Sequence, residues 1–152
     1  MDPQLLRLPA LTVIGVLVHA RGGETNLSTV WDDVGRRAGE VRPRAAPAAA
    51  LGVTFNFQPA AREFDYLAGF PVEAGAAPPE GMVTIEIPAQ TYAAFPCSLQ
   101  TLMEAIHQAN HVWLPGSTYA HTGGPELEYY GDEFNPSDPG SRMFLYIPVR
   151  PR

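Results

Sequence analysis

The sequence of 152 residues contains no lysine, a single cysteine and no long uninterrupted apolar run. The lone Cys97 excludes an internal disulfide framework. No apolar stretch reaches the length of a membrane span, so no membrane contact is expected. The apolar segment 11–18 follows Arg7 and Pro9 and lacks an obvious cleavage site, so we interpret it as a strand and expect a cytoplasmic protein.

Positive charge is scarce: the sequence has ten arginines and 16 acidic residues, and its formal net charge is −6. A chain of this charge is repelled by phosphate backbones, so direct nucleic-acid binding is not expected. The same charge weakly favours cationic partners. Hydrophobic residues make up 45% of the chain and charged residues 17%, which predicts one globular domain over residues 1–152.

Apolar spacing predicts two helices between several strands. A first helix is expected from an N-cap at Asn26 or Ser28 through Ala38, and a second from an N-cap at Ser98 through Ile106. Strands are expected at residues 12–18, 51–57, 63–72, 82–87, 91–95, 125–130 and 143–149. Gly69 inside its strand indicates a bulge or a close backbone approach.

The two halves of the chain resemble each other. Residues 9–12 match residues 88–91, and the same order of strand and helix follows each copy. This predicts an α+β fold built from a duplicated β-α-β-β unit with pseudo-two-fold symmetry, repeated over residues 1–75 and 80–152 with a linker at 74–81. Antiparallel strands with helices on one side, and a ligand cleft between the halves, are the expected arrangement.

An acidic strand near the C-terminus is the most informative segment for function. Alternation places Glu126, Glu128 and Tyr130 on one face of this strand, with Leu127 and Tyr129 on the other. Two carboxylates beside an aromatic ring suit a pocket for a cation. A solvated face above packed Leu127 and Tyr129 is the simpler alternative, and the spacing leaves both open.

Aromatic residues occur in most of the predicted strands, where they are typical of a core or of the walls of a site for a flat lipophilic ligand. Among them are Phe55, Phe57, Phe64, Tyr66, Phe70, Tyr92, Phe95, Trp113, Tyr129, Tyr130, Phe144 and Tyr146.

Metal and nucleophile chemistry have weaker support. Glu104, His107 and His111 share a helix face, but no further ligand stands at metal spacing, so no metal or other cofactor is expected. Cys97 near a helix start is compatible with a nucleophile paired with His107 or His121, and also with an inert thiol.

Taken in order, these segments resemble the GyrI-like small-molecule-binding domain, which is also the effector-binding half of AraC-type and MerR-type multidrug regulators. The resemblance covers nearly the whole chain. Its elements are Pro9-Ala10, Val13–Val16, Trp31–Val34, Leu51–Val53, Phe64–Tyr66 with Gly69 and Val72, Pro88–Phe95, Trp113–Pro115, Pro125–Tyr130 and Tyr146–Val149.

The resemblance implies a stand-alone binding domain for bulky hydrophobic, aromatic or cationic small molecules, acting in sensing, sequestration or detoxification. Glu128 matches the glutamate that faces the family's pocket, although Leu127 replaces the usual aromatic residue before it. The resemblance also implies ligand contacts from Tyr66, Trp113 and Phe55, the last on a strand that faces the same cleft. Tyr130 completes the predicted ligand-binding set.

Two alternatives stay open beside binding. The first is a hydrolase that opens electrophilic cyclopropane-type ligands, in which Glu128 positions or activates water and Tyr66 assists as the second catalytic residue. The second is an inhibitor that associates with DNA gyrase through the acidic loop 132–138, a segment that also suits an ordinary solvated turn.

Overall fold

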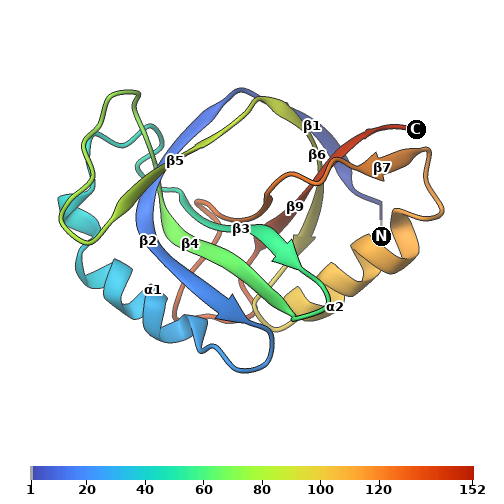
Figure 1. Cartoon of the computed structure of the whole chain (residues 1–152), viewed down its shortest axis with the longest axis horizontal. Coiled ribbons are helices and arrows are strands. Elements are labelled where there is room, and N and C mark those ends of the chain that lie inside the picture. The colour runs from blue at the N-terminus through green and yellow to red at the C-terminus, as the bar shows by residue number, and fades with distance from the viewer. Residues whose placement is uncertain (1) are drawn as a thin grey trace. The chain divides into compact units, whose positions relative to one another are not determined.

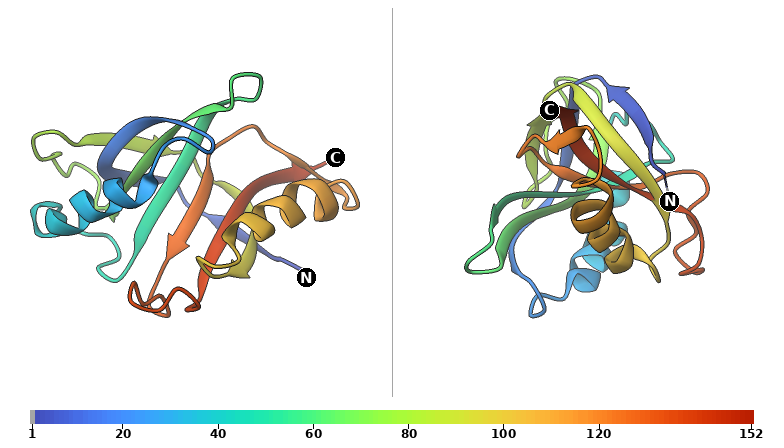
Figure 2. Two further views of the ribbon diagram at one scale, coloured as in Figure 1. Left: turned by 90° about the horizontal axis from the view of Figure 1, so that it is seen from below. Right: turned by 90° about the vertical axis from the view of Figure 1, so that its right-hand side faces the viewer.

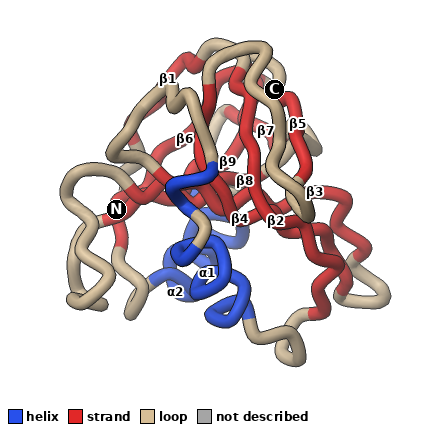
Figure 3. The backbone as a smooth tube through the Cα atoms, turned by 90° about the vertical axis from the view of Figure 1, so that its left-hand side faces the viewer, coloured by secondary structure: helices blue, strands red, loops and turns tan. Residues whose placement is uncertain are grey.

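A computed structural model describes residues 2–152 and divides them into two compact units (Figure 1). We call residues 10–88 the continuous unit, and residues 2–9 together with 89–152 the split unit. Each unit is an antiparallel sheet with one α-helix against one of its faces (Figure 3), which confirms the predicted α+β class. The segment 74–81 lies inside the continuous unit, and the division falls after residues 9 and 88 instead.

The continuous unit follows the predicted order of strand, helix, strand, strand. Its strands pair in the order β5-β2-β4-β3. The elements are β2 (Leu11–Arg21), α1 (Leu27–Arg36), a 3₁₀ turn (Ala38–Glu40), β3 (Ala50–Gln58), β4 (Glu63–Val72) and β5 (Val83–Ile87).

Helix α1 begins where the sequence predicts. The Asn26 side chain accepts a hydrogen bond of 3.0 Å from the backbone N–H of Ser28, which satisfies one of the helix's unpaired donors. Val34 is fully buried against Tyr66 and Phe70 of β4, so the helix covers one face of this sheet. The other face of the same sheet is buried as well, through residues such as Val13, Val53 and Leu67.

Strands β2 and β4 approach closely where Gly15 lies opposite Gly69. A Cβ atom on Gly69 would lie 2.2 Å from the carbonyl oxygen of Ile14, and one on Gly15 would lie 2.1 Å from that of Ala68. Both distances are below any real contact, so only glycine fits at either position. The prediction of a close backbone approach at Gly69 is therefore confirmed.

The split unit contains the rest of the described chain. Its strands pair in the order β1-β6-β9-β8, and the short β7 pairs with β9. The elements are β1 (Gln4–Leu8), β6 (Gln90–Cys97), α2 (Leu102–Gln108), a π-helical segment (Ala109–Trp113), β7 (Tyr119–His121), β8 (Glu126–Tyr130) and β9 (Met143–Pro151). Figure 2 shows α2 lying along β9.

Helix α2 starts later than predicted. It begins at Leu102, and the prediction that Ser98 caps it is wrong. The backbone N–H of Ser98 donates to the Thr101 hydroxyl over 3.0 Å, and the N–H of Thr101 donates back to the Ser98 carbonyl over 3.1 Å. These bonds form a separate turn ahead of the helix, so Ser98 uses its polar atoms there.

Strands β1 and β5 each pair with a strand that is not their neighbour in the sequence. Strand β1 precedes β2 in the chain but pairs with β6, whereas β5 precedes β6 but pairs with β2. The predicted duplication over residues 1–75 and 80–152 stays a prediction. Among residues 2–152, no helix is long and apolar enough to cross a membrane.

Candidate functional site

Glu128 lies on the helix-covered face of the split unit. It is paired with Leu145 of β9, and Leu145 is paired with Phe95 of β6, so the three residues form one row across the sheet. Phe95 and Leu145 pack in the cluster that includes Ala105 and Ala109 of the helical segment. Because directly opposed residues in antiparallel strands point to the same face, the Glu128 carboxylate also points to this face.

The Glu128 carboxylate is hydrogen-bonded within its own strand. The Tyr130 hydroxyl donates to Glu128 Oε1 over 2.6 Å, and Tyr130 itself is only 8% exposed. This contact confirms that Glu128 and Tyr130 share a face. Leu127 is fully buried on the other face, where it lies opposite Tyr146. Glu128 is half-buried, so the alternative of a fully solvated acidic face is excluded at this position.

Glu126, the second carboxylate predicted on this face, is engaged by a histidine. His121 Nε2 lies 2.9 Å from Glu126 Oε2, and the backbone N–H of Gly123 donates to His121 Nδ1. Because Nδ1 accepts this bond, the proton of the ring is on Nε2, which donates to Glu126. Glu126 and Glu128 therefore differ in their partners.

Cys97 stands near Glu128 and is a poor nucleophile. Burial, and secondarily the negative charge of Glu128, raise the pKa of the Cys97 thiol to about 11. The chain around Cys97 is strand and turn, and the helix begins only at Leu102. Of the two alternatives left open for Cys97, the structure therefore supports the inert thiol and not the nucleophile.

Trp113 lies in an aromatic group beside Phe95, at the end of the row away from Glu128. Its ring meets Phe95 edge-on at 5.5 Å between centroids and stacks on Tyr119 at 6.1 Å. It closes a π-helical segment, in which the N–H of Leu114 donates to the carbonyl of Ala109, five residues back. Sequence periodicity gives no signal for such an inserted residue.

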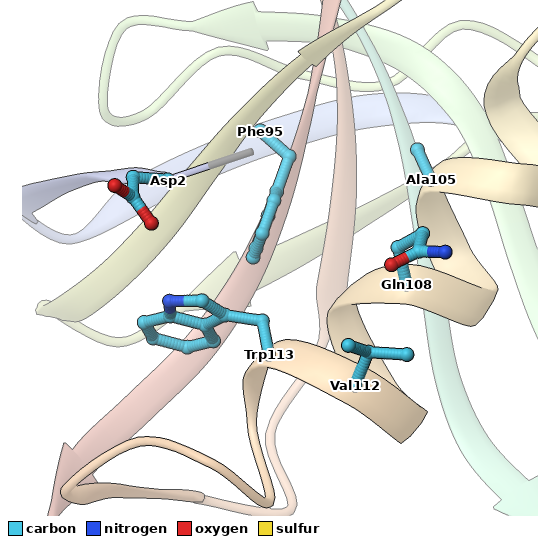
Figure 4. A pocket seen from close by; sticks show the side chains of 6 residues that line it. All are labelled: Asp2, Phe95, Ala105, Gln108, Val112 and Trp113. Carbon is cyan, nitrogen blue, oxygen red and sulfur yellow. The ribbon is translucent and has the colours of Figure 1, made fainter.

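A hollow of about 220 Å³ opens beside Trp113 (Figure 4). Glu128 is not among the residues that line it, so the structure does not bring Trp113 and Glu128 to one hollow. The lining comes from the start of the chain, from β6, and from the helical segment: Asp2, Phe95, Ala105, Gln108, Val112 and Trp113. Asp2 and Gln108 carried no motif, and sequence reasoning missed both.

Tyr66 and Phe55, the predicted ligand contacts in the continuous unit, lie on opposite faces of its sheet. Tyr66 is 1% exposed on the helix-covered face, where its hydroxyl accepts a 2.9 Å hydrogen bond from Trp31 Nε1. Phe55 is paired with Asp65, the neighbour of Tyr66, and so points the other way. The structure therefore does not bring these two rings together.

A polar cluster that the sequence did not indicate lies on the Phe55 side of β4. His19 is held between Asp65 Oδ1 at 2.9 Å and Glu63 Oε1 at 2.6 Å. These two hydrogen bonds, Asp65 first, raise the pKa of His19. The bonds from His19 and then from Asn56 lower the pKa of Asp65.

The helix histidines do not form a metal centre. The rings of His107 and His111 lie 5.0 Å apart between centroids. Across residues 2–152 there is no group of three or more His, Cys, Asp or Glu side chains placed to hold a metal ion.

Residues 4–149 match the family model described as Cass2, integron-associated effector binding protein. The chain is 30% identical over 152 residues to the transcriptional regulator BrlR of Pseudomonas aeruginosa, covering 98% of this chain and 56% of BrlR. It therefore spans about half the length of that relative.

Solved structures share the fold over nearly the whole chain. The structure of SAV2435 bound to tetraphenylphosphonium superposes with a TM-score of 0.74 at 17% identity, covering 99% of this chain and 94% of the other. The C-terminal domain of EcmrR gives a TM-score of 0.67 at 14% identity, covering 99% and 98%. At these identities the likeness shows the fold alone.

Proposed function

The chain belongs to the family of integron-associated effector-binding proteins, and from that premise we propose that it binds bulky lipophilic cations with the Glu128 carboxylate as the anionic anchor. The observation that carries the proposal is the setting of Glu128, a half-buried carboxylate in one row with the buried apolar side chains of Leu145 and Phe95 on the helix-covered sheet face. Such a group attracts a cation more strongly than a solvated carboxylate does, because the surrounding medium screens its charge less.

The hydrogen bond from Tyr130 supports the same proposal. A hydroxyl bonded to Glu128 Oε1 at 2.6 Å fixes the orientation of the carboxylate before any ligand arrives. A preoriented anion loses little conformational entropy on binding. In this proposal Tyr130 positions Glu128, and its buried ring contributes little direct ligand area.

The chemistry of a relative also supports a lipophilic cation as the ligand. SAV2435, which shares the fold, has been solved with tetraphenylphosphonium bound. This ion has an apolar surface and a delocalised charge, so it leaves water readily and gains from a carboxylate in an apolar setting. The net charge of −6 further favours the approach of cations.

The test is titration of the whole chain with tetraphenylphosphonium by isothermal calorimetry, before and after Glu128→Gln. We expect the substitution to weaken binding by about tenfold, because it removes the charge and keeps the side-chain shape. Neutral triphenylphosphine oxide is expected to bind the variant and the parent chain equally. Equal tetraphenylphosphonium affinity for the variant and the parent chain would contradict the proposal.

Glu126→Gln is the matched control. It removes the same charge from the same strand two residues earlier, where the carboxylate is bonded to His121. We expect it to change tetraphenylphosphonium affinity by less than about twofold. A loss as large as that of Glu128→Gln would mean that general charge, rather than the Glu128 site, attracts the cation.

Hydrolysis with Glu128 and Tyr66, and association with DNA gyrase, stay predictions. Mass spectrometry of the ligand recovered after incubation separates binding from hydrolysis, because a hydrolysed ligand gains the mass of one water.

A further inference from the structure

We propose that the hollow beside Trp113 is a second binding site, for small organic cations with an apolar body, separate from the Glu128 site. It lies between the helical segment 102–113, strand β6 and Asp2, two residues before β1 (Figure 4). The proposal goes beyond the function proposed above, because neither the residues nor the size of ligand are the same.

The walls of the hollow are aromatic and apolar, and they are held in place. Phe95 is 2% exposed and meets the Trp113 ring edge-on. Tyr119 stacks on the same Trp113 ring. Ala105 is buried at the base, and Val112 is 55% exposed at the rim. A rigid wall of this kind buries apolar ligand surface at little entropic cost.

The charge of the hollow selects for a cation. In Figure 4 the Asp2 carboxylate and the Trp113 indole lie on the same side of Phe95, with Gln108 and Val112 on the helix across from them. Within the described residues 2–152, no arginine or histidine forms an ion pair with Asp2. Carboxylate and aromatic groups together are the pairing that recognises ammonium ions in proteins.

The size of the hollow excludes the bulky ligand proposed for Glu128. Its volume of about 220 Å³ is below the roughly 300–1,000 Å³ of sites for drug-sized molecules. Phe95 stands on β6 and Glu128 on β8, with β9 between them. Two strand spacings amount to about 10 Å, so a small cation at Trp113 does not reach Glu128.

The experiment is a titration of the ¹⁵N-labelled chain with benzyltrimethylammonium, followed through the indole N–H signals. The sequence has two tryptophans, so Trp113→Phe assigns both signals. We expect the Trp113 signal to shift to saturation with a dissociation constant on the order of a millimolar. Trp31, bonded to Tyr66 in the continuous unit, is expected to stay unmoved and serves as an internal reference.

Charge dependence is tested with Asp2→Asn, which is expected to weaken benzyltrimethylammonium binding by about fivefold. The matched control, Asp32→Asn, removes the same charge from the exposed surface of α1 and is expected to leave binding unchanged. Neutral benzyl alcohol should bind the parent chain more weakly than the cation does and should not discriminate between parent and Asp2→Asn.

The proposal is overturned by the absence of a saturable shift of Trp113, by equal binding to the Asp2→Asn variant, or by equal affinity for benzyl alcohol. The Glu128→Gln variant keeps this proposal apart from the previous one. If that variant loses benzyltrimethylammonium affinity together with tetraphenylphosphonium affinity, the two ligands share one site and the second site does not exist. If only tetraphenylphosphonium affinity is lost, both proposals stand.

Discussion

The two units each cover one face of an antiparallel sheet with a single helix, but they close that face to different degrees. In the continuous unit, α1 buries Val34 completely and its Trp31 side chain is bonded to Tyr66. In the split unit the shorter α2 and its π-helical continuation leave a hollow beside Trp113. Met103 on the same helix is 76% exposed.

This difference gives the two units different roles: the continuous unit is tightly packed, and the split unit holds the candidate binding sites. The buried Tyr66 hydroxyl under α1 is bonded to Trp31 of that helix, whereas the split unit places a half-buried carboxylate, a half-buried thiol and an open aromatic wall on its helix-covered face. A tightly packed sheet keeps its shape, and a loosely covered one admits a ligand. We therefore assign the chemistry of both proposals to the split unit.

The largest expected effect concerns the packing of the continuous unit. Gly69→Ala places a Cβ atom 2.2 Å from the backbone oxygen of Ile14, so two strands must separate. We expect a loss of about 3 kcal/mol in the free energy of unfolding. Denaturant unfolding followed by circular dichroism measures it.

The control for Gly69→Ala is Gly35→Ala in α1, where an added Cβ atom meets nothing within 4 Å. This substitution is expected to gain about 0.5 kcal/mol, because alanine favours a helix. A loss of stability at Gly35 as large as at Gly69 would contradict the view that close strand packing decides the outcome.

The split unit is tested through its cysteine. With the Cys97 pKa at about 11, its reaction with a disulfide reagent at pH 8 should be at least about tenfold slower in the folded chain than in denaturant. Glu128→Gln should raise the folded-state rate by about threefold, because it removes a charge that disfavours the thiolate. An unchanged rate would place Glu128 too far from Cys97 to affect it.

The smallest expected effect lies on the exposed polar cluster of the continuous unit. The raised pKa of His19 gives stability that is present below about pH 6.5 and is lost as pH rises through the folded-state pKa. The lowered pKa of Asp65 gives stability that is present above about pH 3.8 and is lost as pH falls through its folded-state pKa. Both contributions are therefore present between these two values.

The measurement compares thermal unfolding of the parent chain and His19→Gln at pH 5.5 and pH 8.5. We expect the substitution to lower the melting temperature slightly at pH 5.5 and less at pH 8.5, because His19 carries less positive charge at the higher pH. The same difference at both pH values would show that packing of the ring, rather than its charge, accounts for the effect.

Sequence periodicity predicted the elements well where polar and apolar residues recur at a regular spacing. β4 has the predicted bounds of Glu63–Val72, α1 begins after Asn26 as predicted, and the strand with Glu128 has the predicted alternation. Each of these segments has its apolar residues at one clear period. The short strands β1 and β7 were missed, because few residues in them alternate and their pairing depends on distant partners.

Placement of the candidate site residues depended on information that the sequence does not carry locally. Phe55 and Tyr66 belong to neighbouring strands, and only their register, Phe55 with Asp65, decides that they face apart. The π-helical segment adds one residue to the helical turn that ends at Trp113, so the α-helical period does not predict the direction of this side chain. By contrast, Glu128 and Tyr130 are two residues apart in one strand, so their shared face follows from alternation alone.

The pairing of β1 with β6 has a consequence for how the chain folds during its synthesis. Strand β1 leaves the ribosome ahead of the whole continuous unit, and its partner β6 follows some eighty residues behind it. All strands of the continuous unit are available once β5 has emerged, so this unit can close first. Until β6 follows, β1 remains without its partner strand, and its Leu5, Leu6 and Leu8 are open to wrong pairing.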